Sequence, residues 1–311
     1  MQRHDPAAPL PDQAKGAAIA LGNFDGVHEG HQAVIASAHV AAQKLGAPLA
    51  AAVFEPHPRR FFQPDAPPFR LQSPAQRGRA LADLGVVHEF GIGFDTSLAQ
   101  MSDAQFVTDV LRGCFGARHV SVGSNFRFGR GRMGDTESLK RLGAANGFSV
   151  SAVEAVAKDG ERISSTRIRE AVARGAMDEA TRLMGRPFAI EGEVERGFAR
   201  GRGFGFATAN LSLGVYQKPR LGVYAVRADL GDRVWRPGVA SVGVNPTTGT
   251  LPTPLLETHV FEFDHDLYGR TIEVALIAFL RDEARFESIE ALRVQMAQDA
   301  SAAREMLSDQ V

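Results

Sequence analysis

A glycine-rich turn near the start of the chain carries two histidines three residues apart. The segment GNFDGVHEGHQ begins at Gly22 and follows a short apolar run at residues 17–21, so we expect a strand, a turn and then a helix. The first N–H groups of such a helix lack internal partners and attract anions. His28 and His31 would lie together at the start of this helix. The pattern favours a phosphate-binding site.

The two histidines have other possible roles. No Gly-Lys-Ser/Thr follows the turn, so it is not a P-loop, and the imidazoles would have to replace the P-loop lysine. A buried structural histidine or a metal pair is the alternative. A zinc site needs three or four ligands, however, and the single cysteine, Cys114, has no CxxC or HExxH companion. Phosphate binding is therefore favoured over zinc binding.

A second candidate anion site lies in the segment ISSTRIR, at residues 163–169. Its three hydroxyl residues are good N-caps for a helix that continues beyond them. Arg167 and Arg169 fall in the first turn, where a positive charge opposes the helix dipole and costs a few tenths to about 1 kcal/mol when exposed. A bound anion would explain this placement. An ordinary capped helix with solvated arginines is the equally open alternative.

The first half of the chain alternates between strand-like and helical patterns. This alternation predicts a parallel sheet with helices on both faces, in which ligands bind beyond the carboxyl ends of the strands. Gly22, Glu55 and Gly123 all fall at such ends. The expected strands are at 17–21, 49–54, 86–90, 119–122 and 149–153. The first expected helix follows the histidine turn and ends near residue 45, and the others cover 74–84, 103–111 and 136–145.

The pattern changes near Gly185, where a glycine and Pro187 close the last helical segment of the first half. Residues 188–279 are strand-like and rich in turns, which predicts a separate β domain, most simply a small closed barrel. Apolar residues at helical spacing over 288–307 predict a helix that caps this barrel.

Three polar residues of the second half could do chemistry. Strand alternation at 206–211 puts Thr208 and Asn210 on one face, roughly 7 Å apart. Hydroxyl and amide oxygens are ligands suited to Mg²⁺. Glu257 shares a strand face with Leu255 and Phe261, which is an odd place for a charge unless the charge is used. The alternative is that Glu257 is solvated and that the other two are turn or sheet-edge residues.

The HxGH turn and the ISSTRIR segment together resemble the nucleotidyltransferase superfamily, in which two helix N-termini hold the phosphates of ATP. Further segments narrow the resemblance: FEPHPRRFF at 54–62, VGSNFRFGRGRMGD at 122–135, and a long match in the second half. With these, the chain resembles the bacterial bifunctional riboflavin kinase and FMN adenylyltransferase family, also called FAD synthetase. The resemblance covers nearly the whole chain from Ala17 onward.

The resemblance implies a Rossmann-like α/β nucleotidyltransferase domain at residues 17–184, where FMN is adenylylated. A small six-stranded β-barrel riboflavin kinase domain with a C-terminal helix would occupy residues 185–311, and residues 1–16 are expected to be disordered. The implied reactions use ATP with Mg²⁺ to convert riboflavin to FMN, and a second ATP to convert FMN to FAD and pyrophosphate.

The resemblance also assigns roles to individual residues. His28 and His31 would stabilise charge on the phosphates during adenylyl transfer, and Glu257 would accept the proton of the riboflavin hydroxyl. Thr208 and Asn210 would bind the metal. Asn125 is expected to bind flavin or nucleotide. The expected nucleotide and phosphate contacts are Gly22, Phe24, Gly26, Ser164, Ser165, Thr166 and Arg169.

Two loops could contact the flavin or the nucleotide. The loop at 124–135 interleaves three arginines with glycines and phenylalanines, so it could bind phosphate, although a mobile surface loop is the alternative. In FEPHPRRFF, prolines fix an extended path. We expect Phe61 and Phe62 to pack in the core rather than to form a platform under an isoalloxazine ring.

The chain departs from the family pattern in the proposed kinase loop. The family usually has a proline where this chain has Ala207, and the turn beginning at Glu195 differs from the usual His-Gly-Asp. Both departures fall in the segment where the kinase would bind phosphate. Alternatives are a monofunctional FMN adenylyltransferase with an inactive, flavin-binding barrel, or a non-catalytic flavin-binding sensor. A cytidylyltransferase is disfavoured by the appended barrel.

Composition agrees with an enzyme that acts on small molecules. The 311 residues carry a net charge of −1, which disfavours a nucleic-acid binder, and the single cysteine forbids an internal disulfide. Neither a signal-peptide core nor an uninterrupted apolar run long enough to span a membrane is present in the sequence. We therefore expect a cytoplasmic protein without membrane or nucleic-acid partners. The sequence does not indicate its oligomeric state.

Overall fold

The structure is a computed structural model of the 311-residue chain, and it describes residues 1–158, 160–195, 208–244, 254–263 and 265–308. The chain forms two compact units, each described here by itself. Unit 1 comprises residues 1–67 and 74–164, and unit 2 comprises residues 68–73 and 165–311. No helix within the described ranges is long and apolar enough to cross a membrane.

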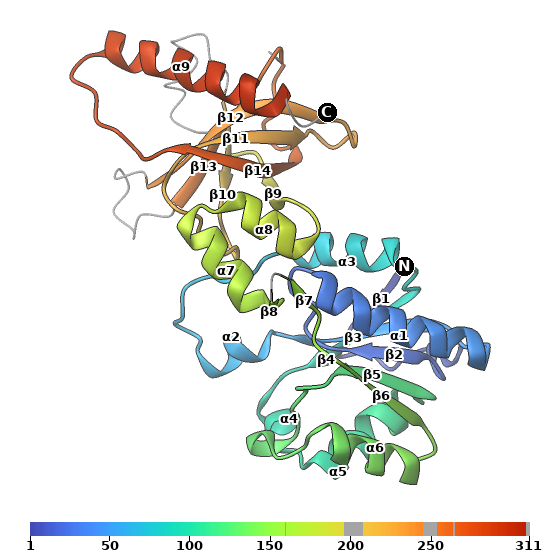
Figure 1. Ribbon diagram of the computed structural model, residues 1–311. Coiled ribbons are helices and arrows are strands. Elements are labelled where there is room, and N and C mark those ends of the chain that lie inside the picture. Colours follow the sequence, from blue (N-terminus) through green and yellow to red (C-terminus); the bar gives the residue numbers. More distant parts are fainter. Residues whose placement is uncertain (159, 196–207, 245–253, 264, 309–311) are drawn as a thin grey trace. The chain divides into compact units, whose positions relative to one another are not determined.

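Unit 1 contains a parallel sheet of six strands in the order β1-β4-β3-β2-β5-β6 (Figure 1). The predicted α/β architecture is confirmed. The five predicted strands are found within a few residues of their expected bounds, whereas β1 was not predicted. The six strands are β1 (Gln2–His4), β2 (Ala18–Leu21), β3 (Leu49–Glu55), β4 (His88–Gly93), β5 (His119–Gly123) and β6 (Ser149–Val153).

Helices cover both faces of this sheet because apolar side chains alternate along its buried strands. Ala18 and Ala20 pack in one core with side chains of α1 and α3, whereas Ile19 and Leu21 pack in the other with α6 and the segment before β5. The helices are α1 (Glu29–Leu45), α2 (Pro58–Phe62), α3 (Pro74–Asp83), α4 (Thr96–Gln100), α5 (Asp103–Gln105), a π-helix (Phe106–Cys114) and α6 (Thr136–Ala145).

Two shorter kinds of element complete unit 1. A two-stranded hairpin, β7 (Ala157–Lys158) and β8 (Glu161–Arg162), lies between β6 and the end of the unit, and 3₁₀ turns occur at Asp12–Ala14 and Arg130–Arg132. The sequence did not predict the hairpin, because each strand has only two residues.

The N-terminal segment, for which the sequence suggested disorder over residues 1–16, contains a short strand. Strand β1 pairs in parallel with β4, at the edge of the sheet. Gly91 of β4 permits this approach, because a Cβ atom there would lie 2.7 Å from Cδ of Pro6 and 3.1 Å from the carbonyl oxygen of His4. The sequence did not predict this strand, because three residues carry no periodicity and the strand is specified only by its partner.

Unit 2 contains a six-stranded antiparallel sheet in the order β10-β13-β12-β11-β14-β9, curled into a nearly closed barrel. The Glu195 N–H donates to the carbonyl oxygen of Asn210 at 2.9 Å and links the two ends of the sheet. The predicted barrel is confirmed. Its strands are β9 (Phe188–Glu193), β10 (Ala209–Ser212), β11 (Gly222–Asp229), β12 (Trp235–Val244), β13 (Pro254–Val260) and β14 (Thr271–Arg281).

The described residues of unit 2 form three helices. Helix α9 (Ile289–Ser308) lies across β11 and β12 (Figure 1), with Ala300, Ala303 and Leu307 packed against outward-facing side chains of the barrel. Helices α7 (Ser165–Arg174) and α8 (Met177–Met184) pack against each other, and α8 contacts β9 and β14. The contacts thus divide the chain before α7, whereas the sequence suggested a division after α8.

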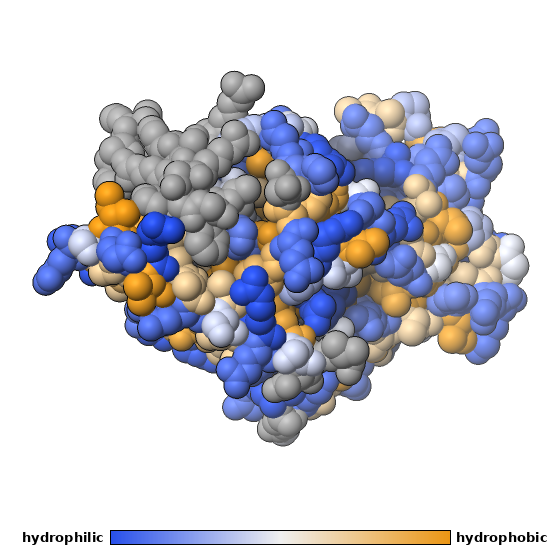
Figure 2. All heavy atoms as spheres, turned by 90° about the horizontal axis from the view of Figure 1, so that it is seen from above, coloured by the Kyte–Doolittle hydropathy of each residue, from blue (hydrophilic) through white to orange (hydrophobic). Residues whose placement is uncertain are grey.

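The face of the molecule seen in Figure 2 carries hydrophilic and hydrophobic residues side by side. Large apolar side chains that reach solvent come from distant segments, such as Val40 on α1 and Met133 in the loop before α6. Isolated residues of this kind are normal on a protein surface. Phe62 differs from them, because it is 65% exposed and also belongs to a group of aromatic rings.

Candidate active sites

The two histidines of the HxGH turn lie against each other at the start of α1. Their ring centroids are 3.6 Å apart and the rings are nearly parallel, at 17°. His28 is the N-cap of α1, is buried, and accepts a hydrogen bond at Nδ1 from the His31 N–H at 3.3 Å. The predicted pairing of the histidines at the helix N-terminus is therefore confirmed. Two imidazoles at the positive end of a helix can stabilise negative charge.

Close packing in the turn explains its glycines. A Cβ at Gly30 would lie 3.2 Å from the ring of His28, and a Cβ at Gly22 would lie 3.3 Å from the ring of Phe24. Phe24 is buried and its ring stands edge-on to His31, with centroids 5.4 Å apart. The buried Phe24 side chain thus packs against His31.

The backbone of this turn occupies unusual conformations. Phe24 has φ of 51° and Val27 has φ of 37°, in the left-handed region that non-glycine residues rarely adopt, and Gly26 has φ of 91°. Such strain persists only where the surroundings enforce it, and it is common at functional sites.

The hairpin and the start of the ISSTRIR segment pack against the beginning of α1. Lys158 Nζ donates to the carboxylate of Glu29 at 2.9 Å, and the carbonyl oxygen of Ile163 lies 3.9 Å from the Cβ position at Gly30. Ile163, the residue before Ser164, therefore lies beside the histidine turn. Lys158 was missed from the sequence, because no local pattern links it to Glu29.

The remaining residues of the ISSTRIR segment begin helix α7 in unit 2. Ser165 and Thr166 form its first turn. Arg169 Nε donates to the carbonyl oxygen of Phe69 at 2.7 Å, and Arg167 lies 3.5 Å from the carboxylate of Glu179. Both arginines therefore have protein partners within unit 2, rather than the purely solvated state considered from the sequence.

A group of aromatic rings, of which only Phe62 is fully exposed, follows the carboxyl end of β3. The rings of Phe61, Phe62 and Phe94 lie 5.2 to 5.6 Å apart, and Phe54 packs edge-on to Phe94 at 5.8 Å. The expectation that Phe61 and Phe62 lie in the core was wrong, because no residue of α2 is buried. Helix α2 has only five residues, so it is too short to bury the rings of Phe61 and Phe62 against the sheet. They form instead an apolar surface at the edge of the sheet.

The glycine-rich loop after β5 is packed rather than loose. Phe128 is buried and stacks with Phe126, with centroids 5.7 Å apart. A Cβ at Gly134 would lie 2.8 Å from the ring of Phe128. Asn125 is exposed, and its Oδ1 accepts a hydrogen bond from Arg162 of β8 at 2.8 Å. Asn125 is thus held by the same hairpin that contacts α1.

Strand pairing in the barrel brings two candidate residues together. Asn210 of β10 lies directly opposite Glu257 of β13, and the neighbouring pair is Ala209 and Thr258. Glu257 is exposed, whereas Thr258 is buried on the opposite face of the strand. Asn210 and Glu257 therefore share one face, as the predicted roles require. Ala207 and the rest of the altered loop at 196–207 lie outside the described residues.

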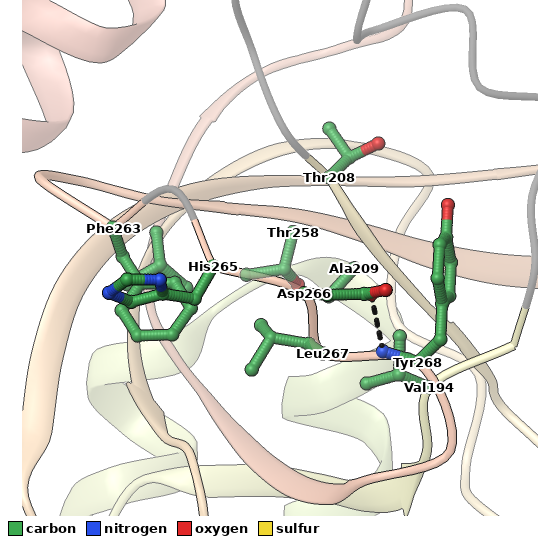
Figure 3. Close-up of a pocket in the computed structure, with 10 residues that line it drawn as sticks. Val194, Thr208, Ala209, Thr258, Phe263, His265, Asp266, Leu267 and Tyr268 are labelled. Atoms are coloured by element: carbon green, nitrogen blue, oxygen red, sulfur yellow. Dashed lines mark hydrogen bonds between the residues drawn. The ribbon is translucent and has the colours of Figure 1, made fainter.

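A pocket opens at one end of the barrel, beside Thr208 (Figure 3). Within it, the Asp266 carboxylate accepts a hydrogen bond from the Tyr268 N–H at 3.0 Å. The sequence analysis missed this pocket, because its walls come from four separate segments. The lining residues are Val194, Thr208, Ala209, Thr258, Val260, Phe263, His265, Asp266, Leu267 and Tyr268. The part of the chain that the structure describes contains no cluster of three or more His, Cys, Asp or Glu side chains suited to a metal.

Comparisons with known proteins match both units. A family profile described as FAD synthetase matches residues 10–167, and one described as riboflavin kinase matches residues 184–307. The chain is 41% identical over 295 residues to the bifunctional riboflavin kinase/FMN adenylyltransferase of Pseudomonas fluorescens, covering 95% of this chain and 94% of that protein. The protein of the same name from Escherichia coli (strain K12) is 38% identical over 292 residues, with 94% and 93% covered.

The chain belongs to this family. The chain is thus a member of the bifunctional riboflavin kinase/FMN adenylyltransferase family. It also has the same fold as a solved structure from Streptococcus pneumoniae that is named a macrolide-efflux protein. The TM-score between the two is 0.84 at 32% identity, with 93% of this chain and 94% of that chain covered. The family match therefore extends over both units and over both candidate sites.

Proposed function

We propose that the protein phosphorylates riboflavin to FMN in unit 2 and adenylylates FMN to FAD in unit 1, using ATP for each reaction. The observation that carries this proposal is that one chain of this family holds two separate constellations. The stacked histidines lie at the N-terminus of α1, and Asn210 and Glu257 face each other across two barrel strands. A single-function enzyme needs only one of them.

In the kinase reaction, the riboflavin 5′-hydroxyl attacks the γ-phosphorus of ATP. The new oxygen–phosphorus bond forms as the bond to the β,γ-bridging oxygen breaks, and ADP leaves. Glu257 takes the hydroxyl proton. Thr208 and Asn210 offer oxygen ligands for Mg²⁺, which would neutralise phosphate charge, and the exposed carboxylate of Glu257 lies opposite Asn210.

In the adenylyltransferase reaction, a phosphate oxygen of FMN attacks the α-phosphorus of ATP and pyrophosphate leaves. This nucleophile is already an anion at neutral pH, so it needs positioning and charge stabilisation more than a base. His28 and His31 supply that stabilisation, and the main chain at Gly22 and Gly26 allows phosphate to approach closely. Of the residues that the resemblance assigns to the β- and γ-phosphates, Ser164 belongs to unit 1 and would contact them there.

The flavin ring of FMN would lie on the aromatic surface formed by Phe61, Phe62 and Phe94. These rings are grouped at the carboxyl end of β3, where ligands of open parallel sheets bind. Offset stacking between aromatic rings suits an isoalloxazine. Asn125, held by Arg162, would contact the flavin or the nucleotide.

The deciding experiment incubates the purified protein with ATP, Mg²⁺ and either riboflavin or FMN, and separates the flavins by chromatography. FAD from both reactions is expected. FAD from FMN alone would support the monofunctional alternative, which the Ala207 departure motivates. Flavin binding, seen as fluorescence quenching, without any product would support the sensor alternative.

A further inference from the structure

We propose that Arg3 is a positioning residue for the FMN adenylyltransferase site, which it reaches through a charge cluster that holds Glu55. The proposal rests on the function proposed above for unit 1. Arg3 lies on β1, in the segment that the sequence predicted to be disordered. Glu55 ends β3, immediately before the segment that carries Phe61 and Phe62.

The charge cluster contains two carboxylates that share one buried arginine. Arg77 Nη2 donates to Glu55 at 2.8 Å and to Glu89 at 2.9 Å. Glu89 is fully buried, and Arg77 is 4% exposed. Burial disfavours the charge on Arg77, but the adjacent Glu89 and Glu55 carboxylates outweigh burial and raise its pKa. By themselves, these three side chains carry a net charge of −1, and burying charge away from water is costly.

Arg3 brings a second positive charge to these three side chains. Its Nε lies 3.4 Å from the Glu89 carboxylate, and its Nη2 lies 3.9 Å from that of Glu55. The cluster then holds two positive and two negative side chains. With Arg3 in place, Glu89 has a second partner, so Arg77 remains available to hold Glu55.

Strand pairing fixes the position of Arg3. Arg3 is the direct register partner of Glu89 in the β1–β4 pair. The next residue, His4, is buried and bonds through Nε2 to Nδ1 of His88 at 3.1 Å. Gly91 leaves room for the chain beyond His4. Arg3 is therefore placed by the fold, although its own side chain is half exposed.

The cluster is connected to the aromatic surface by the main chain of Glu55. Its carbonyl oxygen accepts a hydrogen bond from the Phe94 N–H at 2.9 Å, and the ring of Phe94 packs against Phe61 and Phe62. Loosening Glu55 would disturb both sides of this surface. Loss of Arg3 should therefore weaken the binding of FMN more than it slows the chemical step.

The test compares Arg3→Ala with the unmodified protein in both reactions. We expect the KM for FMN in FAD formation to rise roughly three- to ten-fold, with kcat within about two-fold. The Kd for FMN without ATP, measured by flavin fluorescence, should rise in parallel. FMN formation from riboflavin should be unchanged, because its site lies in unit 2. Arg141→Ala, which removes an exposed positive charge from α6, is the matched control and should change nothing.

A second variant separates charge balance from simple packing. Arg3→Ala combined with Glu89→Gln removes one charge of each sign and leaves Arg77 to Glu55, so the KM and Kd for FMN should return toward their original values. Arg3→Ala without any change in either constant would overturn the proposal. So would equal losses in both reactions, or failure of the double variant to recover. Failure of the unmodified protein to convert FMN to FAD would instead refute the proposed function, while the Kd comparison would still test Arg3.

Discussion

In unit 1 the two histidines come from one turn and lie together because they are three residues apart at the start of a helix. In unit 2, Asn210 and Glu257 come from different strands and lie together only because β10 and β13 pair in one register. A register slip of one residue would move Glu257 to the opposite face of its strand. The first site is thus encoded locally, whereas the second depends on the whole barrel.

The largest expected difference between the two sites is produced by Glu257→Gln. We expect FMN formation from riboflavin to fall roughly 10²- to 10⁴-fold, because the amide cannot accept the hydroxyl proton. FAD formation from FMN should persist. Chromatography of both reactions measures the two rates in one preparation. Glu287→Gln, at an exposed position before α9, serves as the control. Full FMN formation by Glu257→Gln would eliminate Glu257 as the base.

His31→Ala should have the reverse effect. FAD formation from FMN should fall at least about 100-fold, as is typical when one charge-stabilising group is removed. FMN formation should remain nearly intact. The matched control is His39→Ala, which removes another histidine of α1. His39 lies away from the N-terminus of the helix, and in the described contacts it hydrogen-bonds only its helix neighbour Gln43. Equal losses of both activities would contradict separate sites.

Lys158→Ala should have a smaller effect, and this effect should be confined to the reaction of unit 1. Glu29 places a carboxylate at the helix end where phosphate is proposed to bind, and Lys158 neutralises it at 2.9 Å. We expect the KM for ATP in FAD formation to rise roughly three- to ten-fold. Adding Glu29→Gln should restore it. If the single and double variants have the same KM, the pair has no electrostatic role in ATP binding.

These pairs show where sequence interpretation succeeds. The strands and helices of unit 1 follow from alternating patterns, and the neighbouring histidines follow from helical spacing. The register of Asn210 with Glu257 follows from no local pattern, and the resemblance alone placed the two residues in one site. Lys158 and Arg3 could not be predicted, because their partners are distant in the sequence and each pair forms only when the sheet is assembled.

Local errors have equally specific causes. Phe62 was expected in the core because its side chain is apolar, but the short α2 leaves its ring exposed. The helix predicted at 103–111 is a single turn of α5 followed by a π-helix to Cys114, whose hydrogen bonds skip one more residue than those of an α-helix. Apolar spacing does not distinguish these two patterns.

The smallest expected effect concerns stability rather than catalysis. His119 hydrogen-bonds Ser149 at 2.8 Å and Ser121 at 3.0 Å, and Ser121 in turn donates to Ser37 of α1. Burial lowers the pKa of His119. The unfolded histidine, with a pKa near 6.5, therefore takes up a proton more readily than the folded one, so stability present above about pH 6.5 is lost as the pH falls below it.

Thermal unfolding between pH 7.5 and 5 measures this loss. His119→Gln should show a shallower fall in Tm below pH 6.5 than the unmodified protein, although His4 and His88, whose pKa values are also lowered by burial, still contribute. An unchanged pH slope would show that protonation of His119 does not affect folding.

Asn210 has two roles in the barrel. Its main-chain carbonyl accepts the hydrogen bond from Glu195 that links the two end strands of the sheet, β10 and β9, and its side chain is the proposed metal ligand. The position of the Asn210 amide therefore depends on the pairing of β10 with β13, and the hydrogen bond to Glu195 holds β10 from its other side. During refolding, kinase activity would return only in molecules whose β10 has paired, so its recovery would report the assembly of this part of the barrel.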